Sequence, residues 1–220
     1  ALYKGLRKNF IETLILACSQ TSYYTLTMEN DIQHDDLSFC APHVGEPAPD
    51  FVGVTAYQKA GKRKGAEEFV HISLADYRGT WVVLFFYPRD FTFVCPTEIK
   101  EFSRLEKEFE EHHAAILACS TDSKWSHKNW FERDLPNVRY PILADTTQEV
   151  SLAYNVLDSE GASQRGTFII DPDGILRWML VSDNSVGRSV KEVLRALKAL
   201  QTGELCPVEW EPGHKTLGKE

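Results

Sequence analysis

The sequence lacks the excess of positive charge that nucleic-acid binding requires. Its 24 Lys and Arg residues are outnumbered by 32 Asp and Glu residues, which gives a formal net charge of −8. Affinity for nucleic acid comes mainly from clustered Lys and Arg residues that contact phosphates. The one basic cluster, Lys59–Lys64, is short and interrupted by glycine, so we interpret it as a solvated hairpin tip. We expect no nucleic-acid partner.

The sequence also lacks an apolar run long enough to cross a membrane and a pattern of metal ligands. The seven His residues, His127 included, have no ligand-spaced partners, and the five Cys residues match neither a zinc site nor a disulfide framework. Scattered cysteines fit a reducing compartment, in which a thiol outside the core is best explained by reactivity. We expect no metal, no cofactor, no membrane partner and a cytoplasmic location.

The N-terminal segment carries no pattern of a folded domain. Basic residues precede a short apolar stretch, Phe10–Cys18, as in a secretion signal, but a Glu and a Thr interrupt it. The first methionine is Met28, which leaves a targeting segment and a processed extension both open. Polar, Gly- and Pro-containing sequence then continues to Pro49, as in an extended linker. We predict an extension (1–44), a domain (45–200) and a C-terminal arm (201–220).

Apolar residues predict strands that alternate with helices. Trp81–Tyr87 is a continuous β-branched and aromatic run, typical of a central strand that is covered on both faces. From Cys95 apolar residues recur at near-helical spacing, and Pro96 suits a first helical turn. The other predicted elements are a hairpin over Phe51–Tyr57 and Phe69–Leu74, strands at Ala114–Thr121 and Pro141–Ala144, a helix over Asp122–Phe131, a hairpin over Thr167–Val181 and a helix from about Gly187 to Leu200. Together they indicate an α/β fold with a mixed sheet flanked by helices.

Cys95 occupies the first turn of the helix that follows the central strand. Helix N-termini carry unsatisfied N–H groups and partial positive charge, which stabilise a thiolate. Thr92 can supply a hydroxyl near the sulfur, and Pro88 can close the loop without a backbone donor. These residues alone leave two interpretations open, a reactive thiolate and a buried structural cysteine.

The segment FYPRDFTFVCPTEI, which contains Pro88, Thr92 and Cys95, closely resembles the active-site segment of the peroxiredoxins, in the branch that contains alkyl hydroperoxide reductase C. The resemblance covers roughly residues 45–216. It implies a thioredoxin-like fold, in which a five-stranded sheet with helices on both faces is extended at the N-terminus. It also implies that Cys95 attacks the peroxide, that Thr92 and Pro88 orient the peroxide and shield the sulfur, and that Arg165, in QRGTFIID, completes the site.

The implied reaction requires hydrogen-bond donors at two atoms. The thiolate displaces RO⁻ from the O–O bond, so negative charge leaves the sulfur and builds up on the departing oxygen. The Arg165 guanidinium, the Thr92 hydroxyl and the Cys95 N–H can supply these donors without a metal or an organic cofactor. Without the resemblance, Arg165 would be assigned to a surface ion pair. Glu98 can orient Arg165 or can simply be a favourable acidic residue of the first helical turn, and both interpretations stay open.

The expected product is a sulfenic acid, which condenses with a second thiol. Cys206, in GELCPVEW, resembles the resolving cysteine that this family carries on a C-terminal arm. The resemblance implies a disulfide between Cys95 of one chain and Cys206 of another, hence a homodimer, and such dimers commonly form rings of five. Cys119 lies in an apolar run and is assigned to the core, whereas Cys18 and Cys40 receive no role.

The sequence departs from the easily overoxidised members of the family. It has RDLPNVR at positions 133–139, where they have a Gly-Gly-Leu-Gly loop, and it lacks their C-terminal Tyr-Phe pair. We therefore expect a robust enzyme, whose sulfenic acid is resolved before a second peroxide converts it to sulfinic acid. The segment between the last helix and Cys206 is also shorter than usual, which affects how Cys206 reaches Cys95.

The resulting hypothesis is a thiol peroxidase for hydrogen peroxide and small organic hydroperoxides that serves antioxidant defence. Thioredoxin or a flavoprotein disulfide reductase would return the electrons. Two alternatives belong to other classes. A holdase chaperone or redox-signalling scaffold rests on family analogy alone. A binding module on a thioredoxin-like fold is disfavoured by the joint presence of Thr92, Arg165 and Cys206.

Overall fold

The computed structural model of the chain describes residues 41–59 and 68–219. The predictions for Cys18 and Cys40, for most of the extension 1–44 and for most of the basic hairpin tip lie outside these residues. The observations below therefore concern the domain and the segment that follows its last helix.

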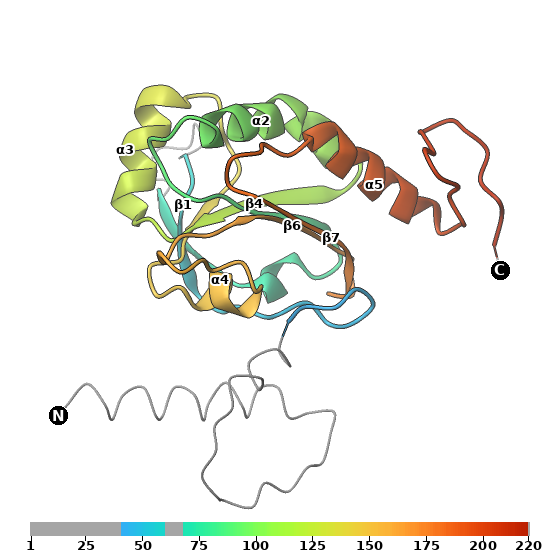
Figure 1. Cartoon of the computed structure of the whole chain (residues 1–220), viewed down its shortest axis with the longest axis horizontal. Coiled ribbons are helices and arrows are strands. Elements are labelled where there is room, and N and C mark those ends of the chain that lie inside the picture. Colours follow the sequence, from blue (N-terminus) through green and yellow to red (C-terminus); the bar gives the residue numbers. More distant parts are fainter. Residues whose placement is uncertain (1–40, 60–67, 220) are drawn as a thin grey trace, which may run out of the picture. The chain divides into compact units, whose positions relative to one another are not determined.

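Strands and helices alternate along the described chain, as the apolar pattern predicts (Figure 1). Both predicted hairpins and the long helix that starts at Cys95 are confirmed. The elements are β1 (Val54–Tyr57), β2 (Phe69–Ile72), the 3₁₀ helix η2 (Leu74–Tyr77), β3 (Trp81–Phe86), α2 (Cys95–Glu111), β4 (Ala114–Ser120), α3 (Lys124–Asp134), β5 (Ile142–Ala144), α4 (Glu149–Ala153), β6 (Arg165–Ile170), β7 (Leu176–Ser182) and α5 (Val190–Thr202).

The sheet orders its strands β2-β1-β5-β4-β3-β6-β7. The central strands β5, β4 and β3 are parallel, whereas the strands at both sides pair antiparallel. The β1–β2 hairpin joins the sheet at β5, and it thereby extends the five strands implied by the resemblance to seven. The predicted mixed sheet is confirmed, and β3 lies inside it, between β4 and β6.

Side chains of β3 alternate between the two faces of the sheet. Val83 and Phe85 pack in one core with apolar residues of α2 and α5, whereas Val82 and Leu84 pack on the opposite face with residues of α4 and η2. Figure 1 shows α2 and α5 on one side of the sheet and α4 on the other. Because both faces are covered, each position of β3 is apolar, which explains the uninterrupted WVVLFF run.

The start of α3 differs from the prediction. The helix begins after Ser123, not at Asp122, because the Ser123 side chain accepts a hydrogen bond from the Ser126 N–H at 3.2 Å. A serine that binds the N–H three residues later satisfies a free donor of the first helical turn. The helix also continues three residues beyond the predicted end at Phe131, to Asp134.

Hydrogen bonds of serines also explain the boundaries of the last helix and of η2. The last helix begins after Ser189 instead of at Gly187, because the Ser189 hydroxyl accepts from the Glu192 N–H at 3.3 Å. It ends where Gly203 adopts φ of 62°, a left-handed conformation that suits glycine. Leu74, which was predicted to end a strand, instead begins η2, whose start is closed by a hydrogen bond from the Ser73 N–H to Asp76 at 2.8 Å.

Among residues 41–59 and 68–219, no helix has both the length and the apolar character needed to cross a membrane.

Candidate active site

Cys95 is the first residue of α2, at the point where the loop after β3 enters the helix. The residue is only 1% exposed. Val94 occupies the N-cap position and supplies no side-chain hydrogen bond to the helix, and Pro96 follows in the first turn. The positive end of the helix dipole therefore acts at Cys95 without a competing side-chain cap.

Two arginines share one carboxylate beside the Cys95 thiol. Arg165 Nη1 lies 3.5 Å from Cys95 Sγ and donates to Glu98 Oε2 at 2.6 Å. Arg188 Nε donates to Glu98 Oε1 at 2.8 Å. The side chains of Arg165, Glu98 and Arg188 are at most 3% exposed. Two guanidinium groups against one carboxylate leave an excess positive charge next to the sulfur, shielded from water.

One backbone carbonyl holds Arg165 in place. Its Nε and Nη2 atoms donate to the Asn184 carbonyl at 3.0 and 2.9 Å, while Nη1 faces Glu98 and the sulfur. The planar guanidinium is thus fixed along both of its edges. The strand β6 supplies Arg165, and the loop between β7 and α5 supplies the carbonyl that orients it.

Arg188 ties three parts of the chain together. Its backbone N–H donates to Glu98 Oε1 at 2.7 Å, and its Nη1 donates to the Gly166 carbonyl at 2.7 Å and to Thr167 Oγ1 at 2.9 Å. Burial lowers the pKa of the Arg188 guanidinium below its usual value, and the ion pair with Glu98 opposes this shift. Arg188 therefore joins the start of α5 to α2 and β6 around the site.

Of the residues selected from the sequence, the structure brings together Cys95, Arg165 and Glu98. Thr92 and Pro88 lie in the loop between β3 and α2. The Thr92 hydroxyl donates to the Arg89 carbonyl at 2.9 Å, and within the described chain no hydrogen bond joins it to the Cys95 thiol. The hydroxyl instead closes a local turn with the residue three positions earlier in the chain.

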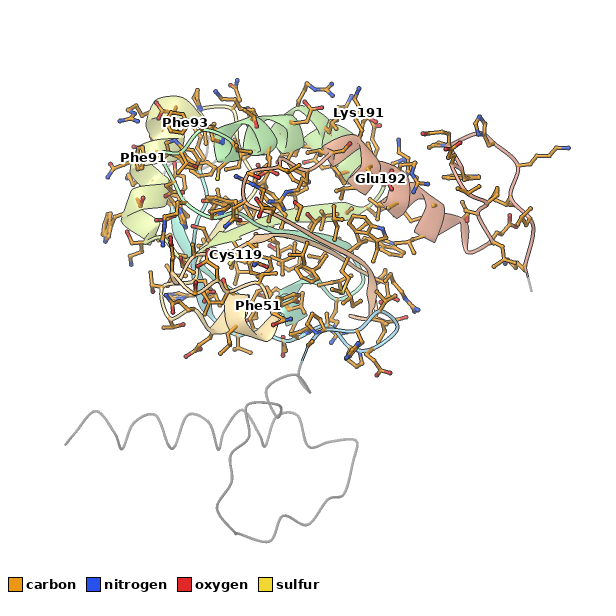
Figure 2. All side chains as sticks on the ribbon, viewed as in Figure 1. Phe51, Phe91, Phe93, Cys119, Lys191 and Glu192 are labelled. Atoms are coloured by element: carbon orange, nitrogen blue, oxygen red, sulfur yellow. The ribbon has the colours of Figure 1, made fainter. Side chains whose placement is uncertain are left out.

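Cys206 lies beyond α5, in the segment 203–219, which we call the arm. Its thiol is half-buried, donates to the Ala199 carbonyl at 3.8 Å and lies 3.5 Å from Thr202 Oγ1. Cys95 and Cys206 are both free thiols. Cys119, labelled in Figure 2, is fully buried as predicted, and burial raises the pKa of its thiol well above the usual value.

The sequence analysis missed Arg188 and Asn184. Arg188 immediately precedes the serine that caps α5, and an arginine at that position has no local pattern that separates it from a surface residue. Asn184 takes part only through its backbone carbonyl, which no side-chain pattern can reveal. Both residues are identified only by their contacts in the folded chain, Arg188 with Glu98 and the Asn184 carbonyl with Arg165.

A second buried polar cluster lies under the loop that precedes Cys95. Asp90 accepts from Tyr87 Oη at 2.8 Å and lies 2.9 Å from His127 Nδ1. The buried state of Tyr87 raises the pKa of its hydroxyl well above the usual value, and the neighbouring Asp90 adds to this shift. The cluster connects the loop to α3. Within the described chain, no group of three or more His, Cys, Asp and Glu residues could hold a metal ion.

Comparisons with known proteins give concordant results. Residues 44–179 match the model of the AhpC/TSA family. A putative peroxiredoxin encoded in the rubredoxin operon of Clostridium pasteurianum is 48% identical over 79% of this chain and 98% of that protein. A mitochondrial thioredoxin-dependent peroxide reductase of Drosophila melanogaster is 47% identical over 81% of this chain and 77% of that protein.

Two solved structures are also similar. The reduced 2-Cys peroxiredoxin of Plasmodium vivax is 36% identical, with a TM-score of 0.72 over 79% of this chain and 91% of that chain. AhpC of Mycobacterium bovis is 39% identical, with a TM-score of 0.70 over 78% of this chain and 99% of that chain.

Proposed function

Because this chain belongs to the AhpC/TSA family and is a typical two-cysteine peroxiredoxin, we propose that it reduces hydrogen peroxide and small organic hydroperoxides with Cys95 as the attacking thiolate. Its sheet with helices on both faces is the thioredoxin-like fold of such enzymes. The observation that carries the assignment of Cys95 is the 3.5 Å contact between its sulfur and Arg165 Nη1, in a site where Glu98 fixes the guanidinium.

The first step is a displacement at the peroxide O–O bond. Cys95 forms the S–O bond, the O–O bond breaks, and the leaving alkoxide takes up a proton to give an alcohol or water. Arg165 sits where it can donate to the oxygens as negative charge moves from sulfur to the leaving group. Thr92 donates its hydroxyl proton to the Arg89 carbonyl, so its oxygen would accept a hydrogen bond from the peroxide. Pro88 would help to shield the sulfur from water.

In the second step, the Cys95 sulfenic acid condenses with the Cys206 thiol to a disulfide and releases water. We place the two thiols on different copies of the chain. The edge strand β7 supports a dimer, because its consecutive residues Met179, Leu180 and Val181 are 38%, 37% and 39% exposed. An apolar strand at a sheet edge is a ready surface for a second copy.

A ring of such dimers would need a second contact surface. Phe91 and Phe93, in the loop before Cys95, are 47% and 94% exposed (Figure 2). Exposed aromatic side chains of this kind support a further contact between dimers. A disulfide reductant, thioredoxin or a flavoprotein disulfide reductase, would then return both cysteines to thiols. The scattered cysteines of the sequence support a reducing compartment such as the cytoplasm.

The deciding experiment adds one equivalent of peroxide to the reduced protein and separates the products on a non-reducing gel. We expect a covalent dimer in the wild type and none in Cys95→Ser or Cys206→Ser. Peroxide consumption that survives Cys95→Ser would exclude Cys95 as the nucleophile. A disulfide-linked monomer in the wild type would exclude the pairing between two copies.

A further inference from the structure

The arm folds back on itself and docks on α5. The Leu205 N–H donates to the Gly218 carbonyl at 2.9 Å, and the Leu217 N–H donates to the Leu205 carbonyl at 2.8 Å, so the two ends of the arm are joined. Inside the arm, Trp210 is only 5% exposed, and its Nε1 donates to the His214 carbonyl at 3.1 Å. The arm therefore has a defined structure before any disulfide forms.

An ion pair on α5 holds this arm. Arg195 Nε and Nη2 donate to the two carboxylate oxygens of Glu192 at 2.6 and 2.7 Å, and its Nη1 donates to the Trp210 carbonyl at 2.9 Å. Glu192 is labelled on α5 in Figure 2. The hydrogen bond from Arg195 lowers the pKa of Glu192, and the bond from Glu192 raises the pKa of Arg195. Both groups thus stay charged around neutral pH, and the guanidinium is directed at the arm.

In the docked arm, the Cys206 thiol is bound at the end of α5 and is not free to react with a sulfenic acid. Its Sγ–H points to the Ala199 carbonyl in the last turn of α5, next to Thr202 Oγ1. A disulfide requires a sulfur–sulfur distance of about 2 Å, and Cys95 is buried at the start of a different helix. The Cys206 thiol must therefore release the Ala199 carbonyl before it can attack a sulfenic acid on another copy.

We propose that Arg195, oriented by Glu192, is a positioning residue for the second step: it retains Cys206 at the end of α5, and its release from the Trp210 carbonyl limits the rate of disulfide formation. This inference rests on the proposed role of Cys206 as the resolving thiol. Cys95 sulfenic acid has two fates. With the Cys206 thiol it gives a disulfide and water, and with a second hydroperoxide it gives a sulfinic acid and an alcohol. The hydrogen bond from Arg195 to the Trp210 carbonyl thereby sets the ratio of disulfide to sulfinic acid.

The test uses Arg195→Met, which keeps much of the side-chain volume and removes the donors. Arg104→Met is the matched control, because Arg104 forms the same bidentate pair with Glu101 on α2, at 2.8 and 2.7 Å, and makes no hydrogen bond to the described part of the arm. We expect Arg195→Met to accelerate disulfide formation roughly fivefold, as fits the loss of one charge-assisted and partly exposed hydrogen bond. The peroxide concentration that gives half sulfinic acid should rise by a similar factor.

Rapid-quench mass spectrometry of the full-length protein follows sulfenic acid, disulfide and sulfinic acid in one time course. The rate of sulfenic acid formation should be unchanged, since Arg195 lies outside the peroxide site. Arg195→Lys, which retains a charged donor group without the planar fork, should restore part of the wild-type partition. Unchanged or slower disulfide formation in Arg195→Met overturns the proposal, and so does an equal acceleration in Arg104→Met.

Hydrogen exchange of the reduced protein tests the docking without any peroxide. The amides of Leu205 and Leu217 should exchange faster in Arg195→Met than in the wild type and in Arg104→Met. Equal amide exchange rates in all three proteins would show that Arg195 does not hold the arm on α5. If the wild type forms no disulfide between Cys95 and Cys206, the proposed function is wrong. The hydrogen-exchange result does not depend on that disulfide, so it tests the docking of the arm separately.

Discussion

Glu98 connects two buried guanidinium groups to the first turn of α2, and this makes its carboxylate the most sensitive group of the site. Arg165 and Arg188 both lose water on burial, and Glu98 compensates the charge of one of them. Removing one partner of a buried ion pair leaves an uncompensated charge that is far more costly than the loss of a surface pair.

Glu98→Gln should therefore weaken the fold as well as the chemistry. We expect the free energy of unfolding to fall by about 3 kcal/mol, because two buried guanidinium groups then face each other without a carboxylate. Urea denaturation at neutral pH measures this change. Glu101→Gln is the control, because its exposed pair with Arg104 lies on the same helix and should leave the unfolding curve in place. Equal stability of the two variants would contradict the account of Glu98.

Arg165→Lys should separate charge from geometry. Lysine keeps the positive charge but cannot bind the Asn184 carbonyl, Glu98 and the sulfur at the same time. We expect the rate of Cys95 oxidation by peroxide to fall about 100-fold, the loss typical of one oriented donor. Stopped-flow mixing with peroxide measures the rate, with Arg104→Lys as the control. A variant as fast as the wild type would show that charge alone suffices.

The residues of the site differ in how far the sequence reveals them. The place of Cys95 at a helix start leaves a reactive thiolate and a buried structural cysteine both open, and the surrounding motif favours the thiolate. Arg165 is indicated by its motif alone. Arg188 does not follow at all, because its function depends on the meeting of three segments that are far apart in the chain. Thr92 shows the opposite case, in which a motif residue is present but its hydroxyl binds another group.

The hairpin of β6 and β7 shows how a local sequence signal fixes an element. The signal is the Pro172-Asp173-Gly174 turn. In the structure, the residue just before the turn, Asp171, accepts several hydrogen bonds. Asp171 accepts from the Ile175 and Asp173 N–H groups at 2.9 and 3.0 Å and from Arg177 Nε at 2.6 Å. Partial burial works in the opposite direction, but these donors hold the pKa of the Asp171 carboxyl below its usual value.

Asp171→Asn should remove the pH-dependent contribution of the Asp171 carboxylate to the free energy of unfolding. A carboxyl whose pKa is lower in the folded state stabilises the fold above its unfolded pKa, and this contribution disappears as the pH falls through the folded pKa. We expect the variant to be less stable by about 1 kcal/mol at pH 7. The gap to the wild type should close below the usual value of 3.8. Thermal unfolding of both proteins from pH 7 to pH 2 measures it, and a gap that is constant with pH would contradict the prediction.

Long elements were predicted with the right type, whereas the two short helices were missed. α2 and α5 present several apolar residues at helical spacing, and β3 is apolar throughout, so each contains enough residues to define a period. α4 spans only Glu149–Ala153 and η2 only Leu74–Tyr77, which is too short for a helical period to repeat. The errors at Asp122 and Gly187 arose because a nearby serine, not the first apolar residue, sets the helix start.

The order of the strands was beyond prediction for a different reason. The sequence indicates which segments are strands, but β1 lies beside β5 and β6 beside β3, pairings that join distant parts of the chain. Such pairings are decided by packing of the whole domain around its two cores. The docked arm is a further feature of this kind, since its contact with α5 leaves no trace in the residue pattern.

At the scale of the whole molecule, the exposed edge of the sheet makes the dimer testable. Leu180→Lys should weaken association of two copies by at least roughly tenfold, because a charge then stands in an apolar edge strand. Analytical ultracentrifugation measures the association, and the covalent dimer on peroxide treatment should decrease with it. Val52→Lys is the control, because Val52 is 78% exposed and lies before β1, at the other side of the sheet. Unchanged association would exclude β7 as the contact.

Resistance to overoxidation is also a property of the whole molecule. The resemblance implies a Gly-Gly-Leu-Gly loop in sensitive members where this chain has Arg133–Arg139. We therefore expect Cys95 to stay mostly in the disulfide form after a slight excess of peroxide in the presence of reductant. Mass spectrometry of the peptide that contains Cys95 gives the ratio directly. Mostly sulfinic Cys95 would contradict the expectation of a robust enzyme.

The short connection between α5 and Cys206 restricts how two copies can be arranged. Gly203–Leu205 is all that separates the helix from the cysteine. At roughly 3.5 Å per residue, the chain from Thr202 to Cys206 spans at most about 14 Å. While α5 stays folded, Cys206 can therefore search only a small sphere around the end of its own helix. The end of α5 thus serves as a ruler, and any dimer that places Cys95 of the second copy outside this sphere cannot form the disulfide.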